Sequence, residues 1–202
     1  MEKNNLYGLR VEESRFNNSR VFSGRYHLLQ YCSKFIPENS VTCEVGVAEG
    51  FYSQIVLDSL QPSKIYLIDL YQHSSPHNEY LPENHFSYIT NKFKNNSRVF
   101  IKKGLSWDML NTLESDSLDY LYIDGDHSYK SVQNDIQAAY RVVKSGGVIQ
   151  FNDYTTFSPV ENMRYGVLNA VNEFIQKYSP EVLGISLDKD GYNDIAIRLL
   201  KH

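Results

Sequence analysis

The chain has 202 residues, of which 42% are hydrophobic and 22% charged, and its formal net charge is -4. This length fits one domain with a short N-terminal extension, and the composition argues against a disordered chain. The negative charge argues against nonspecific binding to nucleic acid, which needs a basic face. No apolar run approaches the roughly 20 residues that cross a bilayer. We therefore expect a globular protein with no nucleic-acid or membrane partner.

The N-terminal part of the chain differs from the rest. About the first 20 residues are polar, which predicts an arm laid over the body or a partly ordered tail. From Gly24 to Phe35 the apolar spacing predicts an amphipathic helix that Pro37 closes. We assign residues 1–38 to this arm and helix, packing on the core, and residues 39–202 to the main domain.

From residue 39 onward, short apolar runs alternate with helical patterns. Strands are predicted at residues 41–47, 64–70, 98–102, 118–124, 148–151, 182–187 and 195–200. Helices are predicted at residues 51–60, 86–93, 106–113, 132–143 and 165–178, the fourth of them capped by Ser145-Gly146-Gly147. Apolar strands separated by helices predict a parallel sheet covered on both faces. The turn signal at residues 188–191 is short, so the last two strands must form an antiparallel hairpin.

The two cysteines, Cys32 and Cys43, fall in a predicted helix and a predicted strand. We interpret both as small buried hydrophobic residues in a reducing compartment and not as a disulfide. The start of the chain lacks the apolar stretch of a secretory signal. These features predict a cytoplasmic location.

Two glycines follow the first predicted strand, in the run Glu44-Val45-Gly46-Val47-Ala48-Glu49-Gly50. Ligands of open α/β sheets bind beyond the carboxyl ends of the strands. Gly46 and Gly50 permit a close backbone approach, and the helix that follows presents free N–H groups to a ligand. A dinucleotide fingerprint has three glycines as G-x-G-x-x-G, which this loop lacks. The loop suits a ligand that carries a small carboxylate, although such a pattern alone also arises by chance.

Further binding residues follow the next two predicted strands. Asp69 ends the second strand about 20 residues beyond the glycine loop, where an acid accepts hydrogen bonds from both hydroxyls of a ribose. It could equally cap a turn. Ser106 and Trp107 come just after the third strand, where Trp107 could stack on a purine or serve as a core aromatic residue. Together these positions predict sites for a carboxylate, a ribose and an adenine in chain order.

The most distinctive runs surround the fourth and fifth predicted strands. They are Leu118-Asp119-Tyr120-Leu121-Tyr122-Ile123-Asp124-Gly125-Asp126-His127-Ser128-Tyr129 and Lys144-Ser145-Gly146-Gly147-Val148-Ile149-Gln150-Phe151-Asn152-Asp153-Tyr154. With the glycine loop and residues 65–70 and 104–110, they resemble class I S-adenosylmethionine (SAM)-dependent methyltransferases. Within that class they are similar to the branch of macrocin-type and caffeoyl-CoA-type O-methyltransferases. The resemblance covers roughly residues 40–200, and the Asp-Gly-Asp-His-Ser-Tyr run is its most specific part.

This resemblance implies a fold, a cofactor and a binding site. The fold is α/β, a Rossmann-like doubly wound and mostly parallel seven-stranded sheet that ends in a C-terminal antiparallel hairpin. The cofactor is SAM. The residues implied to bind it are Glu44, Gly46, Gly50, Ser53, Asp69, Leu70, Ser106, Trp107 and Asp124.

A metal site is a second implication. Asp124 closes the fourth predicted strand, and Asn152 and Asp153 close the fifth. If the two strands are neighbours, as the resemblance implies, their ends lie about 5 Å apart. Oxygen ligands of this kind suit Mg²⁺. Metal-dependent relatives carry an Asp-Asn pair after strand five, whereas this chain has the reverse order, and Asn152 and Asp153 could instead cap a turn.

His127 is the candidate general base, because an unperturbed imidazole has a pKa near 6.5 and accepts a proton at neutral pH. Asp124 is its catalytic partner, and Asp126 could share the role of base. The alternative is that His127 only neighbours a helix N-cap and is bonded to Asp126. The expected reaction is O-methylation of a hydroxylated small molecule, such as a sugar or a phenol, with or without a metal.

Two other functions are compatible with parts of the sequence. One is a non-catalytic SAM-binding protein. The other is a nicotinamide-dependent oxidoreductase, against which the missing third glycine and the terminal hairpin both argue. The acceptor pocket is expected from the N-terminal arm, the loop at residues 71–85 and the stretch Thr155–Met163, which carry no motif that names a substrate. The resemblance also suggests a homodimer that uses the arm.

Overall fold

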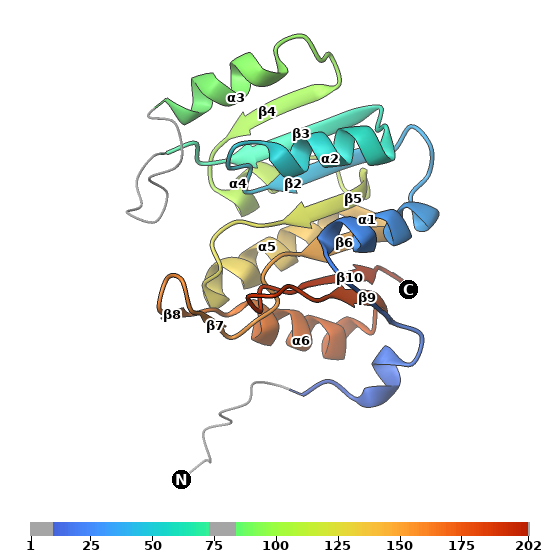
Figure 1. Cartoon of the computed structure of the whole chain (residues 1–202). Coiled ribbons are helices and arrows are strands. Elements are labelled where there is room, and N and C mark those ends of the chain that lie inside the picture. The colour runs from blue at the N-terminus through green and yellow to red at the C-terminus, as the bar shows by residue number, and fades with distance from the viewer. Residues whose placement is uncertain (1–9, 73–83, 202) are drawn as a thin grey trace.

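A computed structural model describes residues 10–72 and 84–201 of the chain (Figure 1). Eight strands form one sheet in the order β1-β9-β10-β6-β5-β2-β3-β4. Neighbouring strands are parallel except at β10, which runs antiparallel to both β6 and β9. The strands are β1 (Arg20–Phe22), β2 (Val41–Val45), β3 (Lys64–Asp69), β4 (Val99–Lys103), β5 (Leu118–Ile123), β6 (Val143–Phe151), β9 (Glu181–Ser186) and β10 (Asp194–Arg198). The mostly parallel sheet and its C-terminal hairpin are confirmed.

Helices cover both faces of this sheet, as a doubly wound fold requires (Figure 1). Side chains from α1, α2 and α3 share one apolar cluster with one face of the strands, and side chains from α4, α5 and α6 share a second cluster with the other face. The helices are α1 (Arg25–Cys32), α2 (Phe51–Leu60), α3 (His85–Phe93), α4 (Ser106–Asn111), α5 (Tyr129–Val142) and α6 (Val167–Tyr178). In the described ranges, no helix is long and apolar enough to cross a membrane.

The central strand β5 shows why the sequence forms two layers of core. All six of its residues are buried. Tyr120 and Tyr122 pack in the cluster of α1, α2 and α3, whereas Leu121 and Ile123 pack in the opposite cluster. Successive side chains of a strand point to opposite faces, so a continuous apolar run is buried on both sides. Because β5 lies between β6 and β2, its carboxyl end is at the centre of the sheet edge where the parallel strands end.

The eighth strand, β1, was not predicted from the sequence. It pairs in parallel with β9 at one end of the sheet, and two of its three residues are exposed. Upstream of it, Val11 and Phe16 pack against the core, and the backbone carbonyl of Arg10 accepts a hydrogen bond from Gln176 Nε2 at 2.5 Å. A short strand with exposed side chains lacks the apolar alternation that marks a strand in a sequence. The described part of the arm thus lies along the body of the protein.

The predicted glycine cap of α5 is wrong. The helix ends at Val142, and Val143 already has extended backbone angles. Gly146 and Gly147 lie within β6, where a β-carbon on Gly147 would approach Val143 Cγ1 to 2.7 Å and Asp119 O to 3.2 Å. Gly147 permits the close approach of β6 to β5, and neither glycine terminates the helix.

Candidate active site

A cleft of about 720 Å³ opens at the carboxyl ends of the parallel strands. From this edge the chain winds through β2, β3 and β4 in one direction and then through β5 and β6 in the other. The cleft lies where the winding reverses, which is the usual ligand site of open α/β sheets. Its lining residues are Val45, Gly46, Ala48, Ile68, Asp69, Leu70, Gln72, Gly104, Leu105, Ser106, Trp107, Asp124, Gly125, Asp126, His127, Asp153, Glu161, Met163 and Tyr165.

Gly46 allows the loops after β2 and β5 to meet at the floor of the cleft. Its φ angle is +80°, and a β-carbon there would lie 1.7 Å from the carbonyl oxygen of Asp124. Backbone hydrogen bonds fix this junction, from Gly46 N to Ile68 O at 2.9 Å and from Asp124 N to Val45 O at 2.8 Å. Any other residue would have to push the two loops apart.

Three predicted cofactor residues support the glycine loop and do not line the cleft. Glu44 is buried and accepts a hydrogen bond from the buried Ser53 hydroxyl, and burial raises the pKa of Glu44 well above its usual value. Gly50 begins α2 with a φ angle of +70°, and a β-carbon there would lie 2.9 Å from Phe93 Cε2. These residues stabilise the conformation of the glycine loop and do not face the cleft.

Asp69 ties the glycine loop to the end of β3. Its Oδ2 accepts a hydrogen bond from Val47 N at 2.7 Å, and its Oδ1 accepts one from Tyr71 N at 2.6 Å. Asp69 also lines the cleft, with the half-exposed Leu70 beside it. Each carboxylate oxygen can accept a second hydrogen bond, so the turn-capping role and a ribose-binding role are compatible.

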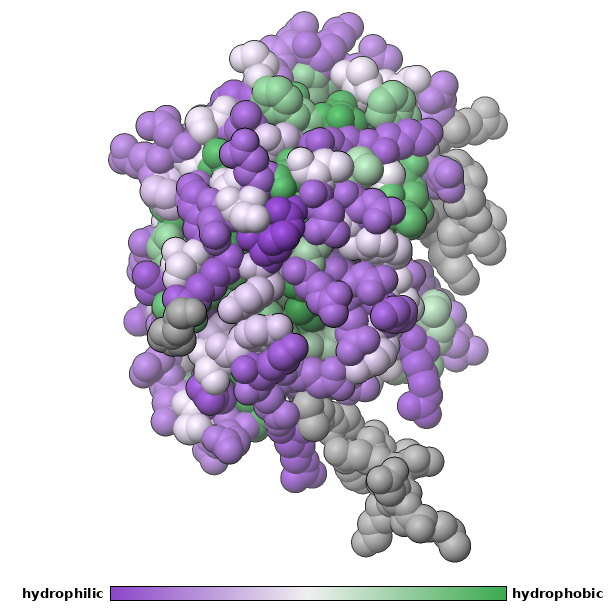
Figure 2. Space-filling model, turned by 180° about the vertical axis from the view of Figure 1, so that it is seen from behind, coloured by the Kyte–Doolittle hydropathy of each residue, from purple (hydrophilic) through white to green (hydrophobic). Residues whose placement is uncertain are grey.

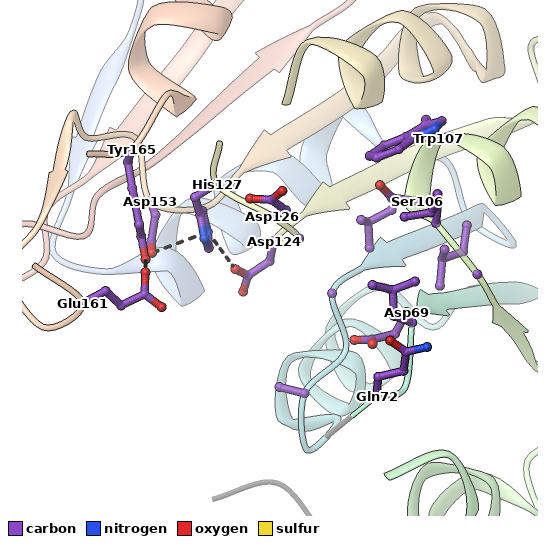
Figure 3. Close-up of a pocket in the computed structure, with 18 of the residues that line it drawn as sticks. Asp69, Gln72, Ser106, Trp107, Asp124, Asp126, His127, Asp153, Glu161 and Tyr165 are labelled. Atoms are coloured by element: carbon purple, nitrogen blue, oxygen red, sulfur yellow. Dashed lines mark hydrogen bonds and ion pairs between the residues drawn. The ribbon is translucent and has the colours of Figure 1, made fainter. Parts of the chain in front are cut away.

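Ser106 and Trp107 begin α4 and line the cleft on the same side as Asp69 (Figure 3). Trp107 is partly buried and also packs against the core cluster of α4, α5 and α6. The core interpretation of Trp107 is therefore confirmed, and its stacking on a purine stays a prediction that its place in the cleft allows.

His127 lies across the cleft from Trp107, between two carboxylates (Figure 3). Its Nε2 is 3.5 Å from Asp124 Oδ1 and 3.6 Å from Asp153 Oδ2. Its ring stacks on Tyr165, with 4.5 Å between ring centroids and 7° between ring planes. Nε2 is shielded from solvent, and no partner within the described residues meets hydrogen-bond criteria.

The pKa values of this group follow from burial and charge. Burial alone would lower the pKa of His127, but Asp124 and then Asp153 outweigh it, so the pKa is raised above 6.5. Burial raises the pKa of Asp153 to about 6, although the charge of His127 opposes the rise. The proton affinity of the imidazole is therefore increased by the two carboxylates that flank it.

Asp126 has a structural role at the start of α5. Its carboxylate accepts hydrogen bonds from Ser128 N at 2.8 Å, Ser128 Oγ at 3.1 Å and Ser131 Oγ at 2.7 Å. Burial acts to raise the pKa of Asp126, but these bonds lower it overall. The hydrogen bonds to the Asp126 carboxylate come from the two serines and not from His127. This argues against the alternative in which His127 is only a hydrogen-bond partner of Asp126.

The three candidate metal ligands, Asp124, Asn152 and Asp153, all lie beside the His127 imidazole. Asn152 is buried, and its side chain donates a hydrogen bond to Asp194 Oδ1 at 3.3 Å, behind the cleft. Asn152 also hydrogen-bonds to His127, and Asp124 and Asp153 flank the same imidazole. Within residues 10–72 and 84–201, no group of three or more His, Cys, Asp or Glu side chains is placed to hold a metal ion. The predicted Mg²⁺ site therefore finds no support in the described residues.

A small hairpin contributes to the His127 side of the cleft. It consists of β7 (Phe157–Ser158) and β8 (Met163–Arg164). Glu161 and Met163 of this hairpin line the cleft together with Tyr165, whose hydroxyl donates to Glu161 Oε2 at 2.5 Å. Met163 falls in the stretch that was expected to form the acceptor pocket, whereas most of the predicted loop at residues 71–85 lies outside the described residues.

Tyr165 was not predicted as a site residue because the sequence pattern places it in a helix. The sequence predicts a helix from residue 165, whereas α6 begins at Val167. The signal in the sequence is the glycine that follows, Gly166, since a glycine at the start of a predicted helix indicates a close backbone contact. In the structure a β-carbon on Gly166 would lie 2.2 Å from Tyr129 Cα. Gly166 N also donates to His127 O at 2.8 Å, which places Tyr165 beside the histidine.

Comparison with known proteins decides the family. A family model described as a methyltransferase domain matches residues 43–154, which span the glycine loop, Asp69 and the run around His127. The chain belongs to this methyltransferase family. Its fold and family are those of a class I SAM-dependent methyltransferase, so a nicotinamide-dependent oxidoreductase is not retained. The narrower macrocin and caffeoyl-CoA branch stays a prediction.

The methyltransferase has relatives in sequence and in structure. It is 31% identical over 191 residues to the uncharacterized protein R132 of Acanthamoeba polyphaga mimivirus, covering 86% of this chain and 80% of that protein. Among solved structures, the trans-methyltransferase CalH in complex with SAH has a TM-score of 0.54 at 12% identity, covering 86% of this chain and 55% of CalH. The tRNA methyltransferase TrmK of B. subtilis has a TM-score of 0.57 at 11% identity, covering 89% of this chain and 67% of TrmK. These two structures share the fold with the methyltransferase.

Proposed function

We propose that this methyltransferase transfers the methyl group of SAM to a hydroxyl group of a small molecule, with His127 as the general base. The observation that carries the proposal is the position of His127 in the same cleft as Asp69 and Ser106, with Nε2 facing Asp124 and Asp153. A protected imidazole of raised proton affinity suits a group that accepts a proton as the new bond forms.

In this proposal SAM binds on one side of the cleft and the methyl acceptor binds on the other. The loop at Gly46 would receive the methionine part of SAM, Asp69 the ribose, and Ser106 and Trp107 the adenine. The sulfonium and its methyl group would then lie near Asp124, at the junction with the His127 side. Carboxylates at that junction favour a cofactor that carries a positive sulfonium charge.

The chemical step then needs only groups that the cleft provides. The acceptor oxygen attacks the methyl carbon in line with the carbon–sulfur bond. A carbon–oxygen bond forms, and the electron pair of the broken bond stays on sulfur, which becomes the neutral thioether of S-adenosylhomocysteine. The proton of the acceptor hydroxyl passes to His127 Nε2, and the resulting imidazolium is stabilised by Asp124 and Asp153.

The charge of the acceptor side supports a small neutral substrate. Five carboxylate residues line the cleft, and no Lys or Arg is among the described lining residues; besides Asp69 they are Asp124, Asp126, Asp153 and Glu161. Phosphate groups would be repelled from such a surface. Met163 and Tyr165 offer contacts to the apolar face of a ring. A sugar or phenol hydroxyl fits this environment better than a nucleic acid.

The test is an acceptor screen that measures S-adenosylhomocysteine formation from SAM with neutral sugars and phenols. We expect turnover with at least one hydroxylated acceptor, and unchanged turnover after treatment with EDTA, because the described residues include no group of three or more His, Cys, Asp or Glu side chains placed to hold a metal ion. Loss of turnover on EDTA treatment, with recovery on Mg²⁺ addition, would contradict the metal-independent mechanism. Tight SAM binding with no turnover on any acceptor would favour the non-catalytic alternative.

A further inference from the structure

A buried histidine at the start of α3 has no role in the chemistry described above. His85 is 2% exposed, and its Nε2 lies 2.5 Å from the carbonyl oxygen of Ala48 in the glycine loop. A carbonyl only accepts hydrogen bonds, so Nε2 carries the hydrogen of this one. The other ring nitrogen is buried and has no partner among the described residues. Burying such an atom is costly, so packing alone would favour an apolar side chain, and the bond to Ala48 gives a reason for a histidine.

Ala48 has a backbone conformation that alanine disfavours. Its φ angle is +43°, in the left-handed region, and the residue lines the cleft. A residue with a β-carbon is strained in this region and keeps the conformation only where its surroundings fix it. The bond from His85 is such a contact, because it sets the direction of the Ala48 carbonyl and so of the peptide plane that follows. A buried donor on α3 therefore controls a strained piece of the cleft wall.

Other contacts also place α3 against the same loop. Lys92 lies about two helical turns after His85, on the same face of α3, and its Nζ donates to Glu49 O at 2.6 Å. A β-carbon on Gly50 would lie 2.9 Å from Phe93 Cε2, so the helix packs directly on the loop. Seen from behind, the end of the molecule that carries β4 and α3 is mostly hydrophilic, with apolar side chains in small patches (Figure 2). We therefore look for the role of the buried α3 residues in these inward contacts.

His85 also joins the glycine loop to the segment after β3. Its ring meets that of Tyr71 edge to face, with 5.1 Å between ring centroids. The backbone N–H of Tyr71 donates to Asp69, which also accepts from Val47 N of the glycine loop. One imidazole thus contacts both segments that carry residues of the cofactor side of the cleft.

We propose that His85 is a positioning residue that holds the glycine loop in the conformation that receives SAM. The inference rests on the proposed function, in which this loop takes the methionine part of the cofactor. With the bond present the loop is already in its binding conformation, so the ligand does not have to order it. Without the bond Ala48 relaxes toward the right-handed region, and binding has to restore the strained form. We expect this loss to weaken binding of the cofactor by about 5- to 30-fold.

The experiment compares His85→Gln with His85→Met, two side chains of similar length of which only glutamine can donate to the Ala48 carbonyl. Calorimetry measures the dissociation constant of S-adenosylhomocysteine. We expect His85→Gln to bind within about threefold of the unaltered protein and His85→Met to bind about 5- to 30-fold more weakly. In turnover assays the KM for SAM should rise by the same factor, whereas kcat at saturating SAM should change less than about twofold, because His85 does not touch the reacting atoms.

Ala48→Gly tests whether the strain at Ala48 is the cause. Glycine adopts the left-handed conformation as readily as the right-handed one, so it does not need the bond to stay there. In the Ala48→Gly background, His85→Met should therefore weaken binding by less than about threefold. A loss as large as in the unaltered background overturns the inference.

The control is Lys94→Met at the exposed C-cap of α3, which should leave the dissociation constant unchanged. Equal dissociation constants in His85→Gln and His85→Met overturn the inference and leave the proposed function standing. If His85→Met does not fold, His85→Phe keeps an aromatic ring beside Tyr71 and lacks the donor, and unweakened binding by that variant also overturns the inference. Failure of the unaltered protein to bind S-adenosylhomocysteine at all overturns the proposed function and this inference together.

Discussion

His127 shows at the scale of one residue how neighbours set a chemical property. The carboxylates of Asp124 and Asp153 raise its pKa above the 6.5 of a free imidazole despite burial. The residue type and the Asp-Gly-Asp-His-Ser-Tyr run could be read from the sequence. The convergence of Asp153 with Asp124 was also predicted, as part of a metal site, whereas the stacking on Tyr165 was not, because Tyr165 follows a hairpin whose conformation no local pattern specifies.

A pH profile tests the state of His127. A raised pKa keeps the imidazole protonated to higher pH, and only the neutral form accepts a proton. We expect kcat/KM to rise with pH and to level off, with a midpoint above 6.5. His127→Ala should lower kcat by about 100- to 10,000-fold, whereas His27→Ala, at an exposed position on α1, should change little. A flat profile, or full activity in His127→Ala, would contradict the role of base.

Gly46 offers a residue-scale test of the cleft floor. Gly46→Ala would place a β-carbon 1.7 Å from Asp124 O, whereas Gly191 has a similar φ angle of +85° with open space around it. Gly191→Ala should therefore cost only the left-handed backbone conformation, about 1 kcal/mol. Gly46→Ala should lower the free energy of unfolding in urea by at least about 2 kcal/mol more, because the loops must separate. Equal effects of the two substitutions would contradict the close contact.

At the scale of elements, Asp194 joins four pieces of the fold behind the cleft. From β10 it accepts hydrogen bonds from Gln150 of β6 at 2.8 Å and Tyr122 of β5 at 3.3 Å, and its Oδ1 lies 3.7 Å from Arg25 Nε of α1. It also holds Asn152. The sequence predicted Asn152 as a metal ligand because its residue type and its position after a strand can be read from the sequence. Its buried hydrogen-bond partner, Asp194 of β10, cannot be read from the sequence because it lies far along the chain.

The buried position of Asp194 predicts how stability depends on pH. Burial raises its pKa from 3.8 to about 7, although Arg25 opposes the rise. The folded state therefore binds a proton that the unfolded state releases, so this contribution to stability is complete below pH 3.8 and is lost as the pH rises through 7. The free energy of unfolding of Asp194→Asn should fall less steeply between pH 4 and 7 than that of the unaltered protein. An identical slope in urea titrations across that range would contradict the assignment.

At the scale of the whole molecule, the order of the strands creates the site. All seven predicted strands are present, and most are buried apolar runs or part of the hairpin marked by a short turn, whereas β4 at the end of the sheet has only half-buried and exposed residues. The order of the strands in the sheet came from the resemblance and not from periodicity, since alternating patterns do not say which strands are neighbours. The strand β1 was invisible because its exposed side chains carry no alternation. The reversal between β2 and β5 brings Asp69, His127 and Ser106 to one cleft from separate parts of the chain.

The central claim is that this cleft binds SAM, and calorimetric titration of the full chain with SAM, S-adenosylhomocysteine and NAD⁺ tests it most directly. The account predicts binding of one SAM or one S-adenosylhomocysteine per chain, no binding of NAD⁺, and weaker SAM binding by Asp69→Ala, which removes the carboxylate that we propose to bind the ribose. Absence of binding heat with both sulfur nucleosides at several temperatures would contradict it.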